Sequence, residues 1–186
     1  KVRRIGFSFH DDYEVFEEIL SAYDWDFCQI QFNYMDTEIQ AGIRGYELAK
    51  SRNIPMTIME PVKGGMLANV PDEIQAEFRR VHPDWSDASW ALRWVGGHDN
   101  VQTVLSGMST MEQVVDNVKT FSEIEPLNAE EQATIEQARQ LFQARIQVPC
   151  TGCRYCMPCP FGLDIPKNFR LLNTAHVYNV QAAQKE

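Results

Sequence analysis

Short apolar runs alternate with longer amphipathic segments over most of the chain. Residues 2–7, 27–32, 56–59 and 101–105 are rich in β-branched or aromatic residues, as expected for strands buried on both faces of a sheet. Residues 13–23, 37–52, 72–81, 87–95 and 111–121 carry apolar residues at helical spacing. The pattern predicts an α/β fold in which strands and helices alternate.

Alternation of this kind predicts parallel strands that are joined by right-handed crossovers. A doubly wound sheet and a (β/α)8 barrel both have this organisation. The four strand-and-helix units of this chain would complete only half of a barrel.

The pattern changes towards the C-terminus. Asn128, with Glu131 three positions later, is a suitable N-cap for a helix. One face of that helix is apolar and consists of Ile135, Ala138, Phe142 and Ile146. Pro149 is expected to end it, and a second helical stretch is expected at residues 167–180. Residues 128–186 are therefore predicted to form a small helical module.

Four of the five cysteines fall within ten residues of this module. They are Cys150, Cys153, Cys156 and Cys159, and Pro160 follows them. Bacterial iron–sulfur proteins have the run C-x2-C-x2-C-x3-C-P, which this chain matches through the third cysteine and misses by one residue before the fourth. A turn through Thr151 and Gly152 would point the first two sulfurs at one centre. The spacing predicts a 4Fe-4S cluster.

Two alternatives use the same cysteines. Structural zinc also binds thiolates, although its Cys-x-x-Cys pairs usually stand further apart. A disulfide is less favoured, because the only cysteine outside the run is Cys28 and the chain is long enough to fold without crosslinks. Cys28 lies in an apolar stretch and is expected to be a buried small hydrophobe. In ferredoxins with two clusters the cysteine before proline binds the other cluster, so the role of Cys159 stays open.

Composition and charge limit the classes of function. The sequence is 44% hydrophobic and 23% charged, within the usual range of globular proteins. No apolar run approaches the length of about 18 residues that a membrane span requires. A net charge of −9 disfavours nucleic acid as a partner. We expect a cytoplasmic protein that binds neither membranes nor nucleic acids.

Polar residues stand where the predicted strands end, which is where barrels bind ligands. Ser8 follows the first strand, Gln29 lies in the second and Glu60 ends the third. The segment 107–110 leads from the fourth strand into a helix, so its N–H groups and hydroxyls are candidates for binding phosphate. Its serine or threonine is equally suited to be an ordinary N-cap. The segment 63–65 is either a ligand loop or an ordinary turn.

Together these segments resemble the aldo/keto reductase family. The resemblance is carried by residues 5–8, 29–33, 59–61, 64–65, 105–109 and Asn117. The cysteine run, with residues 163–166, resembles the tail of the branch of this family that carries a 4Fe-4S ferredoxin-like segment. The resemblance covers nearly the whole chain.

The family resemblance implies a barrel that binds NAD(P)H without a Rossmann fold and passes hydride to a small carbonyl substrate. By position, Ser8 and Gln29 would bind the nicotinamide carboxamide, beside Met59 and Glu60. The phosphate and adenine end would be met by Gly107, Ser109, Thr110, Gln113 and Asn117. This chain has Phe9 where the family commonly has Asn, and Gln113 where many members have Arg for the 2′-phosphate. A preference for NADP over NAD is therefore not predicted.

The resemblance begins at the fifth strand of the family. We therefore expect a fragment, with residues 1–127 forming the C-terminal half of a (β/α)8 barrel. The Asp, Tyr, Lys and His of the family lie in the other half, so the chain alone is expected to be inactive. Open strand edges and an apolar inner face are expected to bind that N-terminal half or a second copy.

Two further functions fit the sequence. A cluster would imply an electron-transfer partner, and the chain would then be a ferredoxin-like module on a degenerate barrel. With zinc in place of the cluster, the chain would be a metal-stabilised structural domain.

Overall fold

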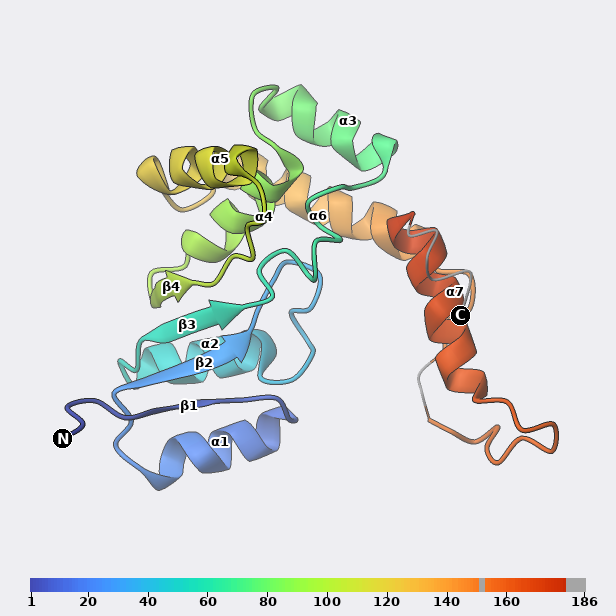
Figure 1. Ribbon diagram of the computed structural model, residues 1–186, viewed down its shortest axis with the longest axis horizontal. Helices are drawn as coiled ribbons and strands as arrows, with labels where there is room; N and C mark the ends of the chain where they lie inside the picture. Colours follow the sequence, from blue (N-terminus) through green and yellow to red (C-terminus); the bar gives the residue numbers. More distant parts are fainter. Residues whose placement is uncertain (151–152, 180–186) are drawn as a thin grey trace.

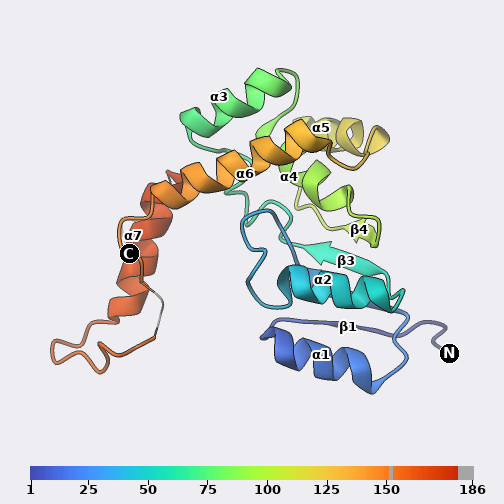
Figure 2. The ribbon, with the colours of Figure 1, turned by 180° about the vertical axis from the view of Figure 1, so that it is seen from behind.

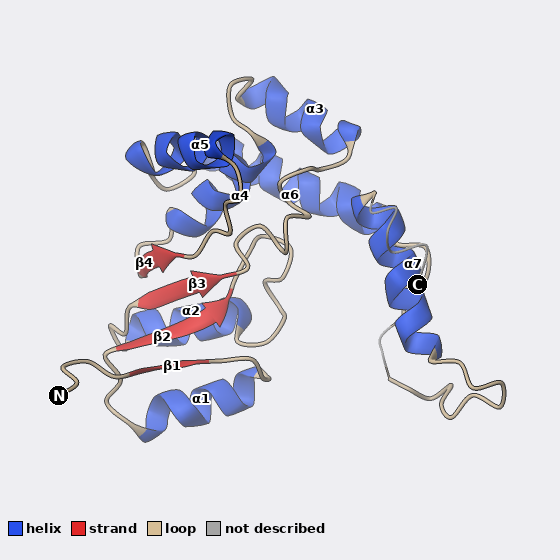
Figure 3. Cartoon of the chain, in the orientation of Figure 1, coloured by secondary structure: helices blue, strands red, loops and turns tan. Residues whose placement is uncertain are grey.

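The computed structural model describes residues 1–150 and 153–179, which form a four-stranded parallel sheet with helices (Figures 1 and 3). The strands are β1 (Gly6–Ser8), β2 (Phe27–Gln31), β3 (Met56–Met59) and β4 (Val101–Val104). Their order in the sheet is β1-β2-β3-β4, so each strand pairs with the next one along the chain. A doubly wound sheet reverses direction between its halves, whereas barrel strands follow one another around the ring. The order is that of a barrel.

Seven helices are described. They are α1 (Tyr13–Ala22), α2 (Gly42–Ser51), α3 (Asp72–Val81), α4 (Asp87–Gly96), α5 (Met111–Ser122), α6 (Ala129–Ala144) and α7 (Ile165–Tyr178). α2 starts later than predicted, because Gln40 has a φ of 57°, which a right-handed helix does not accept. α7 starts earlier than predicted, because the side chain of Asp164 accepts a bond from the Lys167 N–H and Pro166 is tolerated in a first helical turn.

The sheet has one covered face and one open face. The covered face carries four fully buried apolar side chains, Cys28, Ile30, Met56 and Ile58. The open face carries Gln29, Gln31, Thr57 and Met59, all partly buried. Helices α1 and α2 lie on the covered side (Figure 2). The prediction that the strands are buried on both faces is therefore wrong for this chain, because in a barrel the second face is filled by side chains of the other strands.

The open face also corrects the expectation of an apolar inner surface, because most of its side chains are polar. Exposed apolar side chains instead gather on α5. Met111, Val115 and Val118 are 71%, 61% and 64% exposed, and they lie on one face of that helix.

A second core joins α3, α4 and α6. Ile74 and Phe78 of α3 are fully buried, and Phe78 stacks on Trp90 of α4 with ring centroids 4.7 Å apart. Ile135 and Phe142 of α6 belong to the same cluster. The predicted module boundary at residue 128 stays a prediction, since α6 shares this core with the barrel helices.

Helix α7 lies beyond the carboxyl ends of the strands, on the side towards which β2 and β3 point (Figures 1 and 2). Among the described helices, none is long and apolar enough to cross a membrane.

Candidate functional site

Three predicted nicotinamide contacts lie side by side on the open face. Ser8 of β1 is in register with Gln29 of β2. The amide nitrogen of Gln29 donates to the Ser8 hydroxyl at 3.2 Å and to the sulfur of Met59 at 3.6 Å. The row thus crosses three strands, at the carboxyl ends of β1 and β3 and at the middle of β2. It presents an amide, a hydroxyl and a polarisable sulfur to anything that lies on this face.

A cleft of about 300 Å³ lies between the end of β4 and the loop that follows β3. Four of the predicted contacts line it, namely Glu60, Gly107, Gln113 and Asn117. At Gly107 nothing lies within 4 Å of the position that a Cβ would take, so the backbone is open to a ligand. The cleft is therefore placed where barrels bind ligands.

The helix that begins beside this cleft has a complete capping box. Thr110 is the N-cap of α5, and its hydroxyl accepts a bond from the Gln113 N–H. The Gln113 side-chain oxygen accepts bonds from the N–H groups of Ser109 and Thr110 at 2.7 and 3.2 Å. The ordinary N-cap interpretation is thus confirmed for Thr110. Gln113 occupies the N–H groups that were predicted to bind phosphate.

Asn117 lies one turn further along α5 and is buried. Its amide donates to the Ser106 hydroxyl at 2.8 Å. This bond ties α5 to the segment after β4, so Asn117 fixes the width of the cleft as well as lining it.

The loop after β3 is a tight turn. Glu60 and Lys63 have φ values of 55° and 50°, which are uncommon for residues with a Cβ, and Gly64 and Gly65 continue at 61° and 89°. The Glu60 carboxylate accepts a bond from the Gly64 N–H at 2.5 Å. Glu60 therefore closes the turn, a contact that its position in the sequence did not predict.

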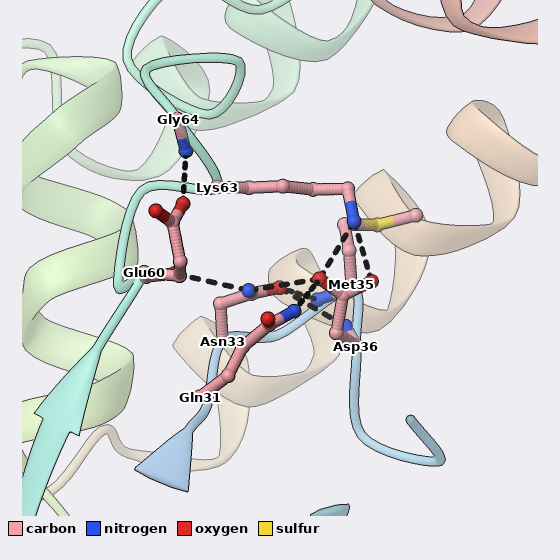
Figure 4. Close-up of polar contacts among 7 residues, drawn as sticks. All are labelled: Gln31, Asn33, Met35, Asp36, Glu60, Lys63 and Gly64. Atoms are coloured by element: carbon pink, nitrogen blue, oxygen red, sulfur yellow. Dashed lines mark hydrogen bonds and ion pairs between the residues drawn. The ribbon is translucent and has the colours of Figure 1, made fainter. Parts of the chain in front are cut away.

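A buried polar network supports this loop (Figure 4). The Lys63 ammonium lies 2.6 Å from the carboxylate of Asp36, which is only 3% exposed. Gln31 and Asn33 also donate to Asp36, at 2.9 and 3.1 Å. Asn33 further donates to the backbone oxygen of Glu60 at 3.0 Å. The network thus joins the segment after β2 to the segment after β3.

Sequence analysis missed Asp36 as a partner. Its only signal was an acidic residue close behind a strand end, in the run Asn33-Tyr-Met-Asp36. The turn through Lys63 to Gly65, for which the sequence allows two interpretations, brings the Lys63 ammonium back to this carboxylate.

The described cysteines differ in their exposure to solvent. Cys28 is fully buried, and this burial raises the pKa of its thiol to about 12, which confirms the prediction of a buried hydrophobe. Cys153 and Cys156 are exposed. Among the described residues, no three His, Cys, Asp or Glu side chains lie close enough together to hold a metal. The predicted turn through residues 151–152 lies outside the described residues.

The strand order, the one-sided helices and the polar row at the strand ends define part of a (β/α)8 barrel. The Aldo/keto reductase family model matches residues 1–140, and the chain belongs to this family. A comparison with curated proteins finds no match.

Solved structures of the family share the fold. An aldo-keto reductase from Bacillus halodurans, AKR11C1, aligns with a TM-score of 0.58 and 24% identity over 73% of this chain and 50% of its own. An aldo-keto reductase from Klebsiella pneumoniae, solved in complex with NADPH, aligns with a TM-score of 0.57 and 20% identity over 74% of this chain and 48% of its own. The chain spans about half the length of the solved structures that it matches.

Proposed function

We propose that this chain supplies the dinucleotide-binding side of an aldo/keto-reductase-type oxidoreductase that uses NAD(P)H to reduce a small carbonyl substrate. The observation that carries the proposal is the cleft beside α5, where Glu60, Gly107, Gln113 and Asn117 come together at the carboxyl end of the sheet. Family membership supports the same conclusion. When bound, the reduced nicotinamide supplies the hydride.

The residues of this chain bind and orient the dinucleotide in the proposal. Ser8 and Gln29 hold the carboxamide, while Met59 lies against the ring face. Gly107 lets the backbone approach the ligand. The hydroxyls of Ser109 and Thr110 at the N-terminus of α5 face the phosphates, while the Gln113 side chain holds the N–H groups of these two residues. Gln113 and Asn117 lie at the adenine side. No general acid for the carbonyl oxygen is among these residues, so we propose that the chain alone is inactive.

Titration with NADPH and NADH, followed by tryptophan fluorescence and calorimetry, tests this proposal. Gly107→Leu extends a side chain from a position in the cleft where a Cβ meets nothing within 4 Å. We expect it to weaken binding about tenfold or more, a change of about 1.4 kcal/mol. Gly107→Ala is the matched control and should weaken binding much less. Absence of binding by either dinucleotide, or equal affinities for the two variants, would contradict the proposal.

We also propose that the cysteine run binds a 4Fe-4S cluster, with zinc as the alternative occupant. The spacing of Cys150, Cys153, Cys156 and Cys159 supports this proposal, although the described residues contain no group of three His, Cys, Asp or Glu side chains that could hold a metal. No step of the proposed reaction is therefore routed through a metal.

Iron, acid-labile sulfide and zinc contents of anaerobically purified protein decide between these occupants. About four irons and four sulfides per chain would establish the cluster and make an electron-transfer partner the next question. Zinc without sulfide would establish a structural site. Protein free of both would overturn the proposal.

A further inference from the structure

A second cavity, the tail cleft, lies between the barrel half and α7. It has a volume of about 660 Å³ and is lined by segments that follow β2 and β3, by the end of α6, by Cys150 and Arg154 of the cysteine run, and by Asp164 and one face of α7. On α7 the lining positions Lys167, Arg170, Thr174 and Val177 recur at helical spacing, so they share one face. This volume is in the usual range for small-molecule sites.

The inner wall of the tail cleft is apolar. Phe142 and Val177 are buried there, and Met35, Met66 and Tyr178 are partly buried. Burial raises the pKa of the Tyr178 phenol, with Asp36 nearby as a smaller cause, so this ring stays neutral. An apolar or aromatic body would be buried against this wall.

The outer wall is cationic. Arg154, Lys167 and Arg170 are exposed there, and no carboxylate in the described part of the chain forms an ion pair with them. Asp164 is the acidic residue at this wall, and its carboxylate caps α7. In a protein of net charge −9, three cations gathered at one cleft form a local field of opposite sign that would attract an anion.

The cleft is held open by bonds that do not involve its cations. The Asn173 side chain donates to the Val148 oxygen at 2.6 Å and accepts from the Gln147 and Val148 N–H groups. Arg145 at the end of α6 donates to the backbone oxygens of His176 and Val177. These contacts fix α7 against α6, so the ligand space exists before binding.

The tail cleft and the dinucleotide cleft share the loop after β3 as a wall. Glu60 and Gly64 line the dinucleotide cleft, whereas Lys63 and Met66 line the tail cleft. The Asp36–Lys63 pair fixes this loop between them. A molecule in the tail cleft is therefore a neighbour of whatever occupies the other cleft.

We infer that the tail cleft binds a small organic anion, with an apolar body against Phe142 and Val177 and a carboxylate or phosphate group at Lys167 and Arg170. The identification of this anion as the carbonyl substrate rests on the proposed function, in which Gln29 of β2 and Met59 of β3 hold the nicotinamide, because segments that follow these two strands line the tail cleft. The reductase would then act on carbonyl compounds that carry an anionic group.

Calorimetric titration of the full chain tests the inference with three probes of similar shape. Phenylpyruvate and phenyl phosphate carry an apolar ring and an anion, whereas phenylacetone is neutral. We expect at least one anion to bind, with an affinity that falls as salt is raised, and the tighter one identifies the anionic group. Equal binding of phenylacetone, or no binding by either anion, would overturn the inference.

Charge removal locates the site. Lys167→Gln and Arg170→Gln should each weaken anion binding about tenfold, whereas Lys119→Gln, on the exposed face of α5, should leave it unchanged. Unchanged affinity in both cleft variants would overturn the inference. A dinucleotide titration of the same preparation separates the two proposals. Anion binding without dinucleotide binding would support the anion site and contradict the reductase function. Dinucleotide binding without anion binding would contradict only the anion site.

Discussion

At the scale of single residues, the pairing of Asp36 with Lys63 has the clearest energetic consequence. Lys63→Met would leave the buried carboxylate of Asp36 without its counter-ion, and we expect it to lower the free energy of unfolding by about 3–5 kcal/mol. Urea denaturation measures this loss. The double variant Asp36→Asn/Lys63→Met should recover part of it, because no unpaired charge remains.

Lys50→Met is the matched control for this prediction. Lys50 pairs with Asp99, but both side chains are largely exposed, so the expected loss is below about 1 kcal/mol. Equal losses for Lys63→Met and Lys50→Met would show that the Asp36 network does not stabilise the loop.

His98 gives the fold a dependence on pH. Its ring donates to the Trp94 oxygen at 2.6 Å and packs against Phe32 and Tyr46, and burial lowers its pKa below the ordinary value of 6.5. Below about pH 6.5, His98 therefore becomes protonated in the unfolded chain while it stays neutral in the folded chain. The free energy of unfolding should fall as the pH drops below this value, by at most about 1.4 kcal/mol per pH unit. Above this value His98 should no longer make the stability dependent on pH.

Denaturation between pH 5 and about 7.5 measures this effect. His98→Gln should flatten the pH dependence of stability, whereas His176→Gln, on the exposed side of α7, should not. Identical slopes for His98→Gln and the unchanged protein would contradict the assignment.

At the scale of elements, the N-terminus of α5 serves both stability and binding. Gln113→Ala removes half of the capping box and should cost about 0.5–1 kcal/mol of unfolding free energy. It also frees the N–H groups of Ser109 and Thr110. Because the proposal places Gln113 at the adenine side of the dinucleotide, we expect the affinity for NADPH to fall together with the stability. An affinity that stays level or rises would show instead that Gln113 only caps α5 and that the freed N–H groups are open to the phosphates.

The existence of the elements could be predicted from sequence, and their ends only in part. Apolar runs and helical spacing located every strand and helix that the structure describes. The late start of α2 could not be predicted, because it depends on the left-handed backbone conformation of Gln40. The spacing of apolar residues along the sequence carries no information about that conformation. The network at Asp36 depends on a contact across 27 positions, so local pattern did not contain it either. Strand register brings Ser8 beside Gln29, whereas Met59 is paired with Gln31 and reaches Gln29 only through its side chain.

At the scale of the whole molecule, α5 presents an apolar stripe that the described residues leave exposed. We predict that the stripe, with the open edges of the sheet, binds the N-terminal half of the barrel or a second copy. Val115→Glu combined with Val118→Glu should reduce this association, because it buries charge in an apolar contact. Light scattering at micromolar concentration measures it, and a monomeric unchanged protein would contradict the prediction.

The strand order also bears on how the chain folds. Because β1, β2, β3 and β4 pair in the order in which they occur, each strand meets its partner after a single crossover, which contains two helices, α3 and α4, between β3 and β4. Contacts between close neighbours in sequence are made at low cost in loop-closure entropy. Each strand, with the helix that follows it, can therefore pack against the preceding strand while the chain is being synthesised. The sheet would then form in the order β1, β2, β3 and β4.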